Sequence, residues 1–109
     1  MPMYNELIYL ATKQSTTNEV GDQIETLVKQ MRFAKLMSIG QAEFYQAQAQ
    51  GLKPELKFKL ADYLDYENQE IVIYNGFIYK VLRTFRTGNE IEIVVYGGVR
   101  MEVVADGDS

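Results

Sequence analysis

Hydrophobic and polar residues alternate with a period of two along most of this 109-residue chain. The clearest example is the segment 55–63, in which Leu56, Phe58 and Leu60 are separated by lysines. Such alternation is typical of a strand with one buried and one exposed face. The segment 6–13 also alternates, but apolar residues occupy most positions on both of its faces. The chain is therefore predicted to be mainly β.

The last third of the chain predicts a meander of three antiparallel strands. Asn75-Gly76 separates two alternating runs and has the sequence of a type I′ turn. A two-residue turn at this point sets three cross-strand pairs, which are Tyr74 with Phe77, Ile73 with Ile78, and Val72 with Tyr79. Both faces of the segment 71–74 are apolar, so the helix, barrel curvature or another subunit must cover the second face.

A second turn of the meander is predicted at Thr87-Gly88-Asn89. A three-residue loop there places Arg86 opposite Glu90, as a favourable cross-strand charge pair. The third strand follows, with three aliphatic residues on its inward face: Ile91, Ile93 and Val95.

One segment breaks the alternation. Residues 39–50 are rich in alanine and glutamine, which favour a helix. Ser38 and Gln41 have the spacing of a capping box, and Gly51 follows where a left-handed C-terminal cap is expected. The sequence therefore predicts a single mid-chain helix in a β domain.

The remaining segments define the predicted domain organisation. Residues 14–22 are polar and aperiodic, which predicts a long loop. Residues 23–37 predict either two strands, divided near Lys29-Gln30, or one long bent strand. Residues 1–98 are expected to form one domain. The segment 99–109 is expected to be an edge strand or an arm that completes a neighbour's sheet, with an acidic tail.

The composition removes several classes of chemistry. The chain has no cysteine and no histidine, which excludes thiolate chemistry, Cys-based zinc sites and the commonest general base. A net charge of −4 without a basic stripe makes the chain a poor candidate for tight nucleic-acid binding. No apolar run approaches the ~20 residues that span a bilayer, and no signal peptide opens the chain. We therefore expect a soluble protein made in the cytosol that is not an enzyme and needs no cofactor.

Two groups of polar side chains could suggest a metal site or a catalytic site, but each has a simpler interpretation. Asp62, Asp65 and Glu67 offer oxygen ligands, but their spacing matches no EF-hand, so a solvated loop is preferred and no metal is expected. A nuclease-like site could in principle be assembled from five residues, but their spacing along the sequence does not require them to meet. They are Glu43, Tyr45, Arg83, Arg86 and Glu90. The simpler interpretation is that Arg86 and Glu90 form a cross-strand charge pair and that Glu43 is a solvated residue of the helix.

The helix surface is a candidate for subunit contact. Its alanines and glutamines permit close approach of a neighbour, although a helix that covers one barrel mouth is an equal alternative. The loop 62–69 adds two tyrosines that are expected to be exposed. The candidate subunit-interface residues are Glu43, Tyr45, Gln46, Gln48, Ala49, Tyr63 and Tyr66.

Two motifs resemble a known family. They are the helical run Glu43-Phe44-Tyr45-Gln46-Ala47-Gln48 and the strand–turn–strand IVIYNGFIYKVL, with Gly76 and Tyr79. Together they resemble the head–tail joining proteins of long-tailed bacteriophages, also called head completion, head closure or stopper proteins. The resemblance covers roughly residues 4–97. The family usually has a basic residue before the hairpin glycine, where this chain has Asn75.

The resemblance implies a small antiparallel β-barrel of about six to seven strands with one helix at residues 39–50. It also implies a homo-oligomeric ring in the virion neck, below the portal and adaptor proteins. Such a ring closes the DNA-filled head and offers the surface on which tail completion proteins dock, with only transient proximity to the packaged DNA. The polar loop then contacts the channel through Ser15, Thr16, Thr17, Asn18, Glu19, Val20 and Gly21.

Two alternative functions remain open at this point. A tail completion or tail terminator protein has a similar size and also forms rings. A small nucleic-acid-binding barrel is the alternative from another class.

Overall fold

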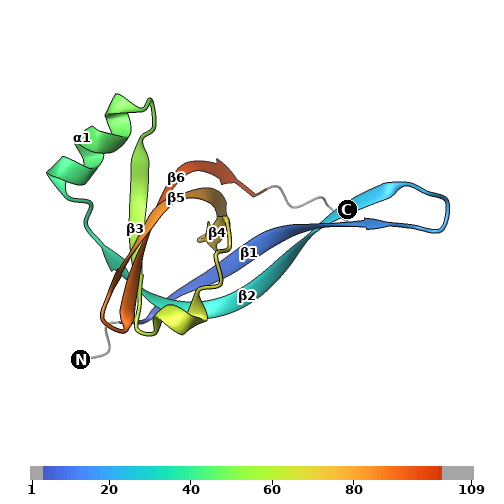
Figure 1. The fold of residues 1–109 in the computed structure, drawn as a ribbon, viewed down its shortest axis with the longest axis horizontal. Helices are drawn as coiled ribbons and strands as arrows, with labels where there is room; N and C mark the ends of the chain where they lie inside the picture. Colours follow the sequence, from blue (N-terminus) through green and yellow to red (C-terminus); the bar gives the residue numbers. More distant parts are fainter. Residues whose placement is uncertain (1–3, 102–109) are drawn as a thin grey trace.

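The computed structural model describes residues 4–101. Its elements in chain order are β1 (Glu6–Thr17), β2 (Gln23–Met37), α1 (Gln41–Ala49), β3 (Pro54–Leu60), the short 3₁₀ helix η1 (Tyr63–Asp65), β4 (Ile71–Tyr74), β5 (Phe77–Thr87) and β6 (Glu90–Arg100). The six strands are antiparallel and close into an uneven barrel in the order β1-β2-β3-β6-β5-β4 (Figure 1). The predicted fold class, mainly β with one mid-chain helix, is confirmed.

Alternate residues of the strands fill the barrel interior. The core comprises Ile8, Leu10, Ala34, Phe58, Leu60, Val72, Tyr79, Ile91, Ile93 and Val95. Phe58 and Leu60 are buried, and Leu56 packs against them, as the alternation in the segment 55–63 predicted. The three aliphatic residues of β6 also point inward as predicted.

The turn between β4 and β5 follows its sequence signal. Asn75 and Gly76 both have positive φ, at 56° and 82°, which a type I′ turn requires. The register that results contains all three predicted pairs, from Tyr74 opposite Phe77 to Val72 opposite Tyr79.

The turn between β5 and β6 differs from the prediction. Thr87 pairs with Glu90, so the loop has two residues, and Arg86 lies opposite Ile91. Gly88 has a φ of 61°, and a glycine with positive φ at the first central position suits a two-residue type II′ turn. The predicted Arg86–Glu90 pair is therefore wrong.

β6 continues through Gly97 and Gly98 and passes the predicted boundary at residue 98. Its last residue is Arg100, and Gly97 accommodates the strand with a φ of 68°. The start of the predicted separate segment 99–109 is therefore part of β6. Residues 102–109, with the acidic tail, lie outside the described residues.

The helix ends as predicted but begins differently. Gly40 is the N-cap, with an extended backbone and no side-chain hydrogen bond at the helix start. Ser38 lies two residues before this cap, too early to bond the first turn, so the predicted capping box is wrong. At the other end Gly51 has a φ of +79°, and the N–H groups of Gly51 and Leu52 bond back to carbonyls of the last turn at 2.9 and 3.0 Å. This is a Schellman C-cap.

β1 and β2 are longer than the barrel needs. They pair from Glu6 opposite Ala34 to Thr17 opposite Gln23, which makes residues 23–37 one long strand. β4 pairs with β1 only along 9–11, and β3 pairs with β2 only along 35–37. The far halves of the two strands therefore leave the barrel as a two-stranded ribbon, residues 12–28 (Figure 1).

Candidate functional site

Most of the predicted polar loop 14–22 is strand. β1 continues to Thr17 and β2 begins at Gln23, which leaves only Asn18–Asp22 in the turn. The prediction of a long irregular loop is therefore wrong. Threonine is β-branched and favours strands, and ladder hydrogen bonds need no apolar side chain. Of the candidate contact residues, Ser15, Thr16 and Thr17 lie on β1, whereas Asn18, Glu19, Val20 and Gly21 form the turn.

The ribbon tip has a defined structure. The Asn18 N–H donates to the Asp22 carbonyl at 2.9 Å, and the Gly21 N–H donates to the Asn18 carbonyl at 3.1 Å. The Asn18 side-chain oxygen accepts from the N–H groups of Val20 and Asp22, as in an Asx turn. The tip therefore presents its side chains from an ordered turn.

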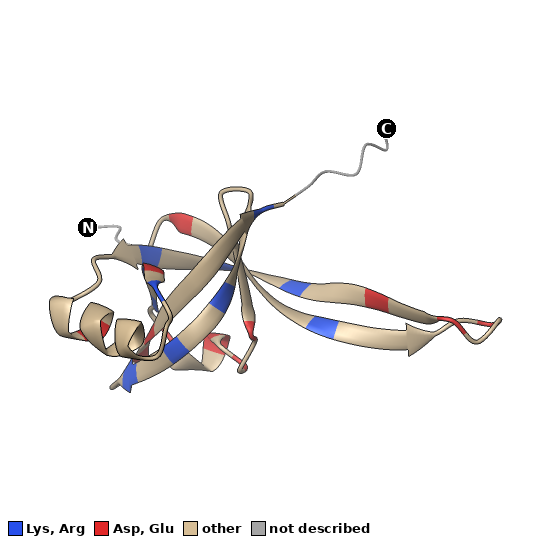
Figure 2. Ribbon diagram, turned by 90° about the horizontal axis from the view of Figure 1, so that it is seen from above, with Lys and Arg blue, Asp and Glu red and all other residues tan. Residues whose placement is uncertain are grey.

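The distal ribbon is acidic. Lys13 and Lys29 lie at its base, and the only charged residues between them in the sequence are Glu19, Asp22 and Glu25. Figure 2 shows this separation, with the basic positions near the barrel and the acidic positions toward the tip. Within residues 4–101, no ion pair neutralises the three carboxylates. The tip therefore carries an unneutralised negative field that repels polyanions.

A row of apolar side chains crosses the outer surface of the barrel. Direct cross-strand pairs link it across five strands: Met31 with Tyr9, Tyr9 with Ile73, Ile73 with Ile78, and Ile78 with Val99. Leu7 and Phe33 form a further pair beside it. We call these seven residues the outer stripe. Phe33, Met31 and Val99, toward the two ends of the stripe, are 56%, 51% and 66% exposed, whereas Ile73 at its centre is only 4% exposed.

The helix does not cover the outer stripe. Glu43 of α1 bonds Lys57 of β3 and Arg83 of β5, and both of these residues lie opposite Val94 of β6. Val94 is only 2% exposed beneath them. α1 therefore lies over β3, β5 and β6 around Val94, whereas the stripe reaches β5 and β6 only at Ile78 and Val99.

The second face of β4 is covered within the chain: Ile71 and Ile73 are only 6% and 4% exposed, and they cluster with Ala11, Leu27, Ile78 and Met101. Of the covers expected for this face, curvature of the sheet therefore provides it and the helix does not.

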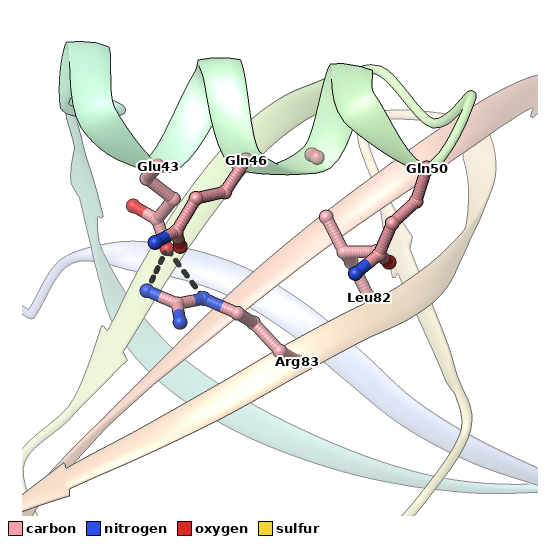
Figure 3. Close-up of a pocket in the computed structure, with 6 residues that line it drawn as sticks. Glu43, Gln46, Gln50, Leu82 and Arg83 are labelled. Atoms are coloured by element: carbon pink, nitrogen blue, oxygen red, sulfur yellow. Dashed lines mark hydrogen bonds and ion pairs between the residues drawn. The ribbon is translucent and has the colours of Figure 1, made fainter.

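Glu43 fixes the helix to the barrel. One carboxylate oxygen is 3.2 Å from Lys57 Nζ. The other is 2.8 Å from an Arg83 terminal nitrogen and 2.9 Å from Arg83 Nε (Figure 3). Burial alone raises the pKa of Glu43, but hydrogen bonds from Arg83 and Lys57 outweigh it and leave the pKa below its usual value. The side chain is 11% exposed, so the expected solvated Glu43 is wrong.

An open hollow of about 240 Å³ lies beside this cluster. It is lined by Glu43, Gln46, Ala47, Gln50, Leu82 and Arg83 (Figure 3). Ala47 is the one buried residue of α1, and Tyr45, Gln48 and Ala49 are exposed. Because both oxygens of Glu43 are already bonded, the cluster positions the helix and offers no free general base.

Tyr63 and Tyr66 are not the exposed side chains that the sequence suggested. Both are partly buried and pack against the core cluster. The Tyr66 hydroxyl donates to the Gln69 carbonyl at 2.7 Å, and the Arg86 guanidinium stacks 3.4 Å from the centre of the Tyr63 ring. The exposed apolar residue of this segment is Leu64, which the sequence analysis missed because local periodicity is absent here.

The structure separates the five residues of the nuclease-like group. Glu43 and Arg83 are bonded to each other, but the Tyr45 side chain is 62% exposed. Arg86 stacks on a tyrosine, and Glu90 bonds the hydroxyl of Tyr4 and the amine of Lys59. The hydrogen bonds from these two partners lower the pKa of Glu90. These residues do not converge on one reactive position.

The acidic residues of the segment 62–67 have local roles. The Asp62 side chain caps η1 by accepting from the Leu64 N–H at 2.9 Å, and an Asp65 oxygen lies 3.9 Å from Arg32 Nε. Among residues 4–101, no three acidic side chains are grouped as metal ligands.

Two comparisons of the sequence with known proteins found no match. No protein-family model matches the chain, and no curated protein sequence matches it. In the part of the chain that the structure describes, no helix has the length and apolar content needed to cross a membrane.

Proposed function

We propose that this protein is a structural, ring-forming component of the head–tail connector of a long-tailed phage. The ring lies below the portal and adaptor proteins, closes the DNA-filled head, and presents the surface on which the tail docks. The protein is a virion component, and its partners are further copies of itself and the neck proteins above and below. The observation that carries this proposal is the acidic ribbon that projects from the closed barrel.

The ribbon supports a contact role because the core does not need it. Every residue from 12 to 28 is exposed except Leu27, so the ribbon adds almost nothing to the apolar interior. An isolated two-stranded ribbon is at best marginally stable in water. Retention of six extra residue pairs, from Thr12 opposite Val28 to Thr17 opposite Gln23, is therefore best explained by a contact outside the subunit.

The charge of the ribbon argues against a tip that binds DNA. A channel that conducts DNA must not hold the phosphate backbone tightly. The carboxylates of Glu19, Asp22 and Glu25 repel phosphates, whereas a nucleic-acid-binding barrel would offer lysine or arginine at such a tip. The alternative of a nucleic-acid-binding module is for this reason less favourable.

The outer stripe supports assembly into a ring. Met31 and Phe33 on β2 and Val99 on β6 are each more than half exposed. Large apolar side chains that stay exposed in this way are candidates for contact with a neighbouring subunit. Tail completion and tail terminator proteins also form rings, and the position of the subunit in a particle distinguishes them from a head-closing protein.

Complementation of defective heads tests the proposal. Purified protein is added to DNA-filled, tailless heads made without it, followed by tails. We expect it to prevent DNA leakage and to restore infectious particles. Heads that retain DNA and join tails equally well without the protein would contradict the proposed function.

A further inference from the structure

The base of the ribbon borders a groove that differs in charge from the tip. The groove is a hollow of about 330 Å³ on the outer surface, with Ile71, Ile78 and Val81 among its lining residues. Lys13 and Lys80 line it with one acidic residue, Glu70. Lys29 stands nearby, opposite Ala11 in the register. We call this hollow the basic groove. Within residues 4–101, none of its lysines forms an ion pair.

The groove is continuous with the outer stripe. Ile78 belongs to both, and Ile71 packs with Ile73 and Ala11 in a second apolar cluster outside the barrel core. A ligand of this surface must therefore combine aliphatic groups with negative charge.

The ribbon tip has this combination of groups. Glu19 and Asp22 supply the charge, and Val20 is 79% exposed between them. Ile24, the next exposed aliphatic residue, is 42% exposed. The tip is ordered by the Asn18 hydrogen bonds, so docking it requires little loss of conformational freedom.

A subunit cannot place its own tip in its own groove. Lys13 at the groove and Glu19 at the tip are separated by six residues along an extended strand, which spans about 20 Å. The ribbon also points away from the barrel (Figure 1). The tip that fits the groove must therefore come from a second copy of the chain.

We propose that the acidic tip of each ribbon docks in the basic groove of a neighbouring copy. One tip in one groove, repeated head to tail, produces a ring if the rotation closes. This inference rests on the proposed function for the ring itself, and it assigns the contact between its subunits.

Charge reversal with exchange tests the contact. One variant carries Glu19→Lys and Asp22→Lys, and another carries Lys13→Glu and Lys80→Glu. We expect the wild-type protein to self-associate in sedimentation velocity, less strongly as salt rises. Each variant alone should associate about tenfold more weakly, because like charges then face each other. An equimolar mixture of the two variants should associate as the wild type does.

Matched controls reverse exposed charges elsewhere. Lys53 and Glu67 lie outside the ribbon and the groove, so the variants Lys53→Glu and Glu67→Lys should associate as strongly as the wild type. Because the chain has no cysteine, Val20→Cys protein mixed with Lys80→Cys protein should also form an intermolecular disulfide, whereas Lys53→Cys should not replace Lys80→Cys.

Several results would overturn the proposal. They are a protein that stays monomeric at every concentration, association that neither variant weakens, and a mixture that fails to recover. A closed dimer that is weakened by reversal of either the tip charges or the groove charges would support the tip–groove contact but contradict the ring. If the protein fails to complement defective heads but the mixture of the two variants still associates as the wild type does, the proposed phage function is contradicted and the tip–groove contact is still supported.

Discussion

Glu43 illustrates how much of the architecture depends on single side chains. Its two carboxylate oxygens reach Lys57 and Arg83, which lie on different strands and flank Val94. Ala47 is the one helix residue that is buried, so apolar packing alone holds α1 weakly. The ion pairs therefore make a larger contribution to the position of this helix than they would on a helix with a wide apolar face.

We expect Glu43→Gln to lower the free energy of unfolding by about 1–2 kcal/mol at neutral pH, discounted because Arg83 is half-exposed. Hydrogen bonds from Arg83 and Lys57 hold the folded-state pKa of Glu43 below its usual value. Its contribution is therefore fully present above about pH 5 and is lost as the pH falls through the folded pKa. Urea unfolding of both proteins should show a difference at pH 7 that disappears in acid.

The matched control for this prediction is Glu67→Gln, in the exposed loop before β4. It should change stability by less than about 0.5 kcal/mol at either pH. A difference between the wild type and Glu43→Gln that stays constant down to strong acid would show that the carboxylate charge is not the cause.

Gly98 is required because a side chain would enter occupied space. A Cβ at this position would lie 2.5 Å from Cε1 of Tyr79 and 2.9 Å from a carboxylate oxygen of Glu55. Tyr79 belongs to the core, so the ring has little freedom to move. We expect Gly98→Ala to destabilise the protein by about 1–3 kcal/mol. Thermal unfolding in a Tyr79→Leu background should show a smaller cost, and equal costs in both backgrounds would exclude the steric explanation.

At the scale of elements, the ribbon and the barrel have separate roles. The barrel holds nearly all the buried residues, and the ribbon holds the turn and the distal acidic charges. The two share β1 and β2, whose buried residues (Ile8, Leu10, Ala11 and Ala34) all lie outside the ribbon. The ribbon is therefore an extension that the barrel supports but does not require.

Ribbon removal separates these roles. We replace residues 15–25 with Asn-Gly, which joins Gln14 to Thr26 by a type I′ turn. These two residues already face each other in the register. We expect cooperative thermal unfolding to persist with a similar midpoint, and self-association and head complementation to be lost. A shortened protein that no longer folds would show that the ribbon has a structural role instead.

The elements that local rules control were predictable from the sequence. Asn75-Gly76 selects its turn through positive φ, and Gly51 ends the helix for the same reason. The predicted capping box at Ser38 was wrong because the helix begins at Gln41, beyond the reach of the Ser38 side chain. The second turn, which contains Gly88, has two residues and not the predicted three, so Arg86 lies opposite Ile91 and not opposite Glu90.

The candidate surfaces depended on tertiary structure that no local pattern contains. Ser15 to Thr17 pair through backbone groups alone, so their polar side chains gave no strand signal. Glu43 meets Arg83 across 40 residues, through a register of β5 that contains a bulge near Arg83. The apolar second face of β4 was visible in the sequence, but the side on which the helix docks was not.

At the scale of the whole molecule, the ribbon and the stripe give the protein two contact surfaces. The described residues extend 49 × 34 × 26 Å, and the ribbon accounts for the long dimension (Figure 1). The helix covers the barrel around Val94, and the outer stripe keeps exposed apolar side chains on β2 and near the end of β6. Such a subunit has more exposed apolar surface than its own fold uses, which suits a member of an assembly.

The stripe can be altered without loss of the fold. Met31 and Phe33 are both about half-exposed, so aspartate at both positions should change stability by no more than about 1 kcal/mol. We expect this double variant to fold, as circular dichroism would show, and to fail in head complementation. Phe85→Asp, at a position that is 57% exposed and outside the stripe, is the control and should remain active.

The position of the subunit in a particle tests the central claim most directly. Under the proposed function a phage encodes this chain, and cryo-electron microscopy of that phage should resolve the neck between head and tail. We expect density for a ring of these barrels between the adaptor and the first tail protein, with the acidic ribbon tips between neighbouring subunits. A neck built without this protein, or the protein found only at the far end of the tail, would contradict the proposed function.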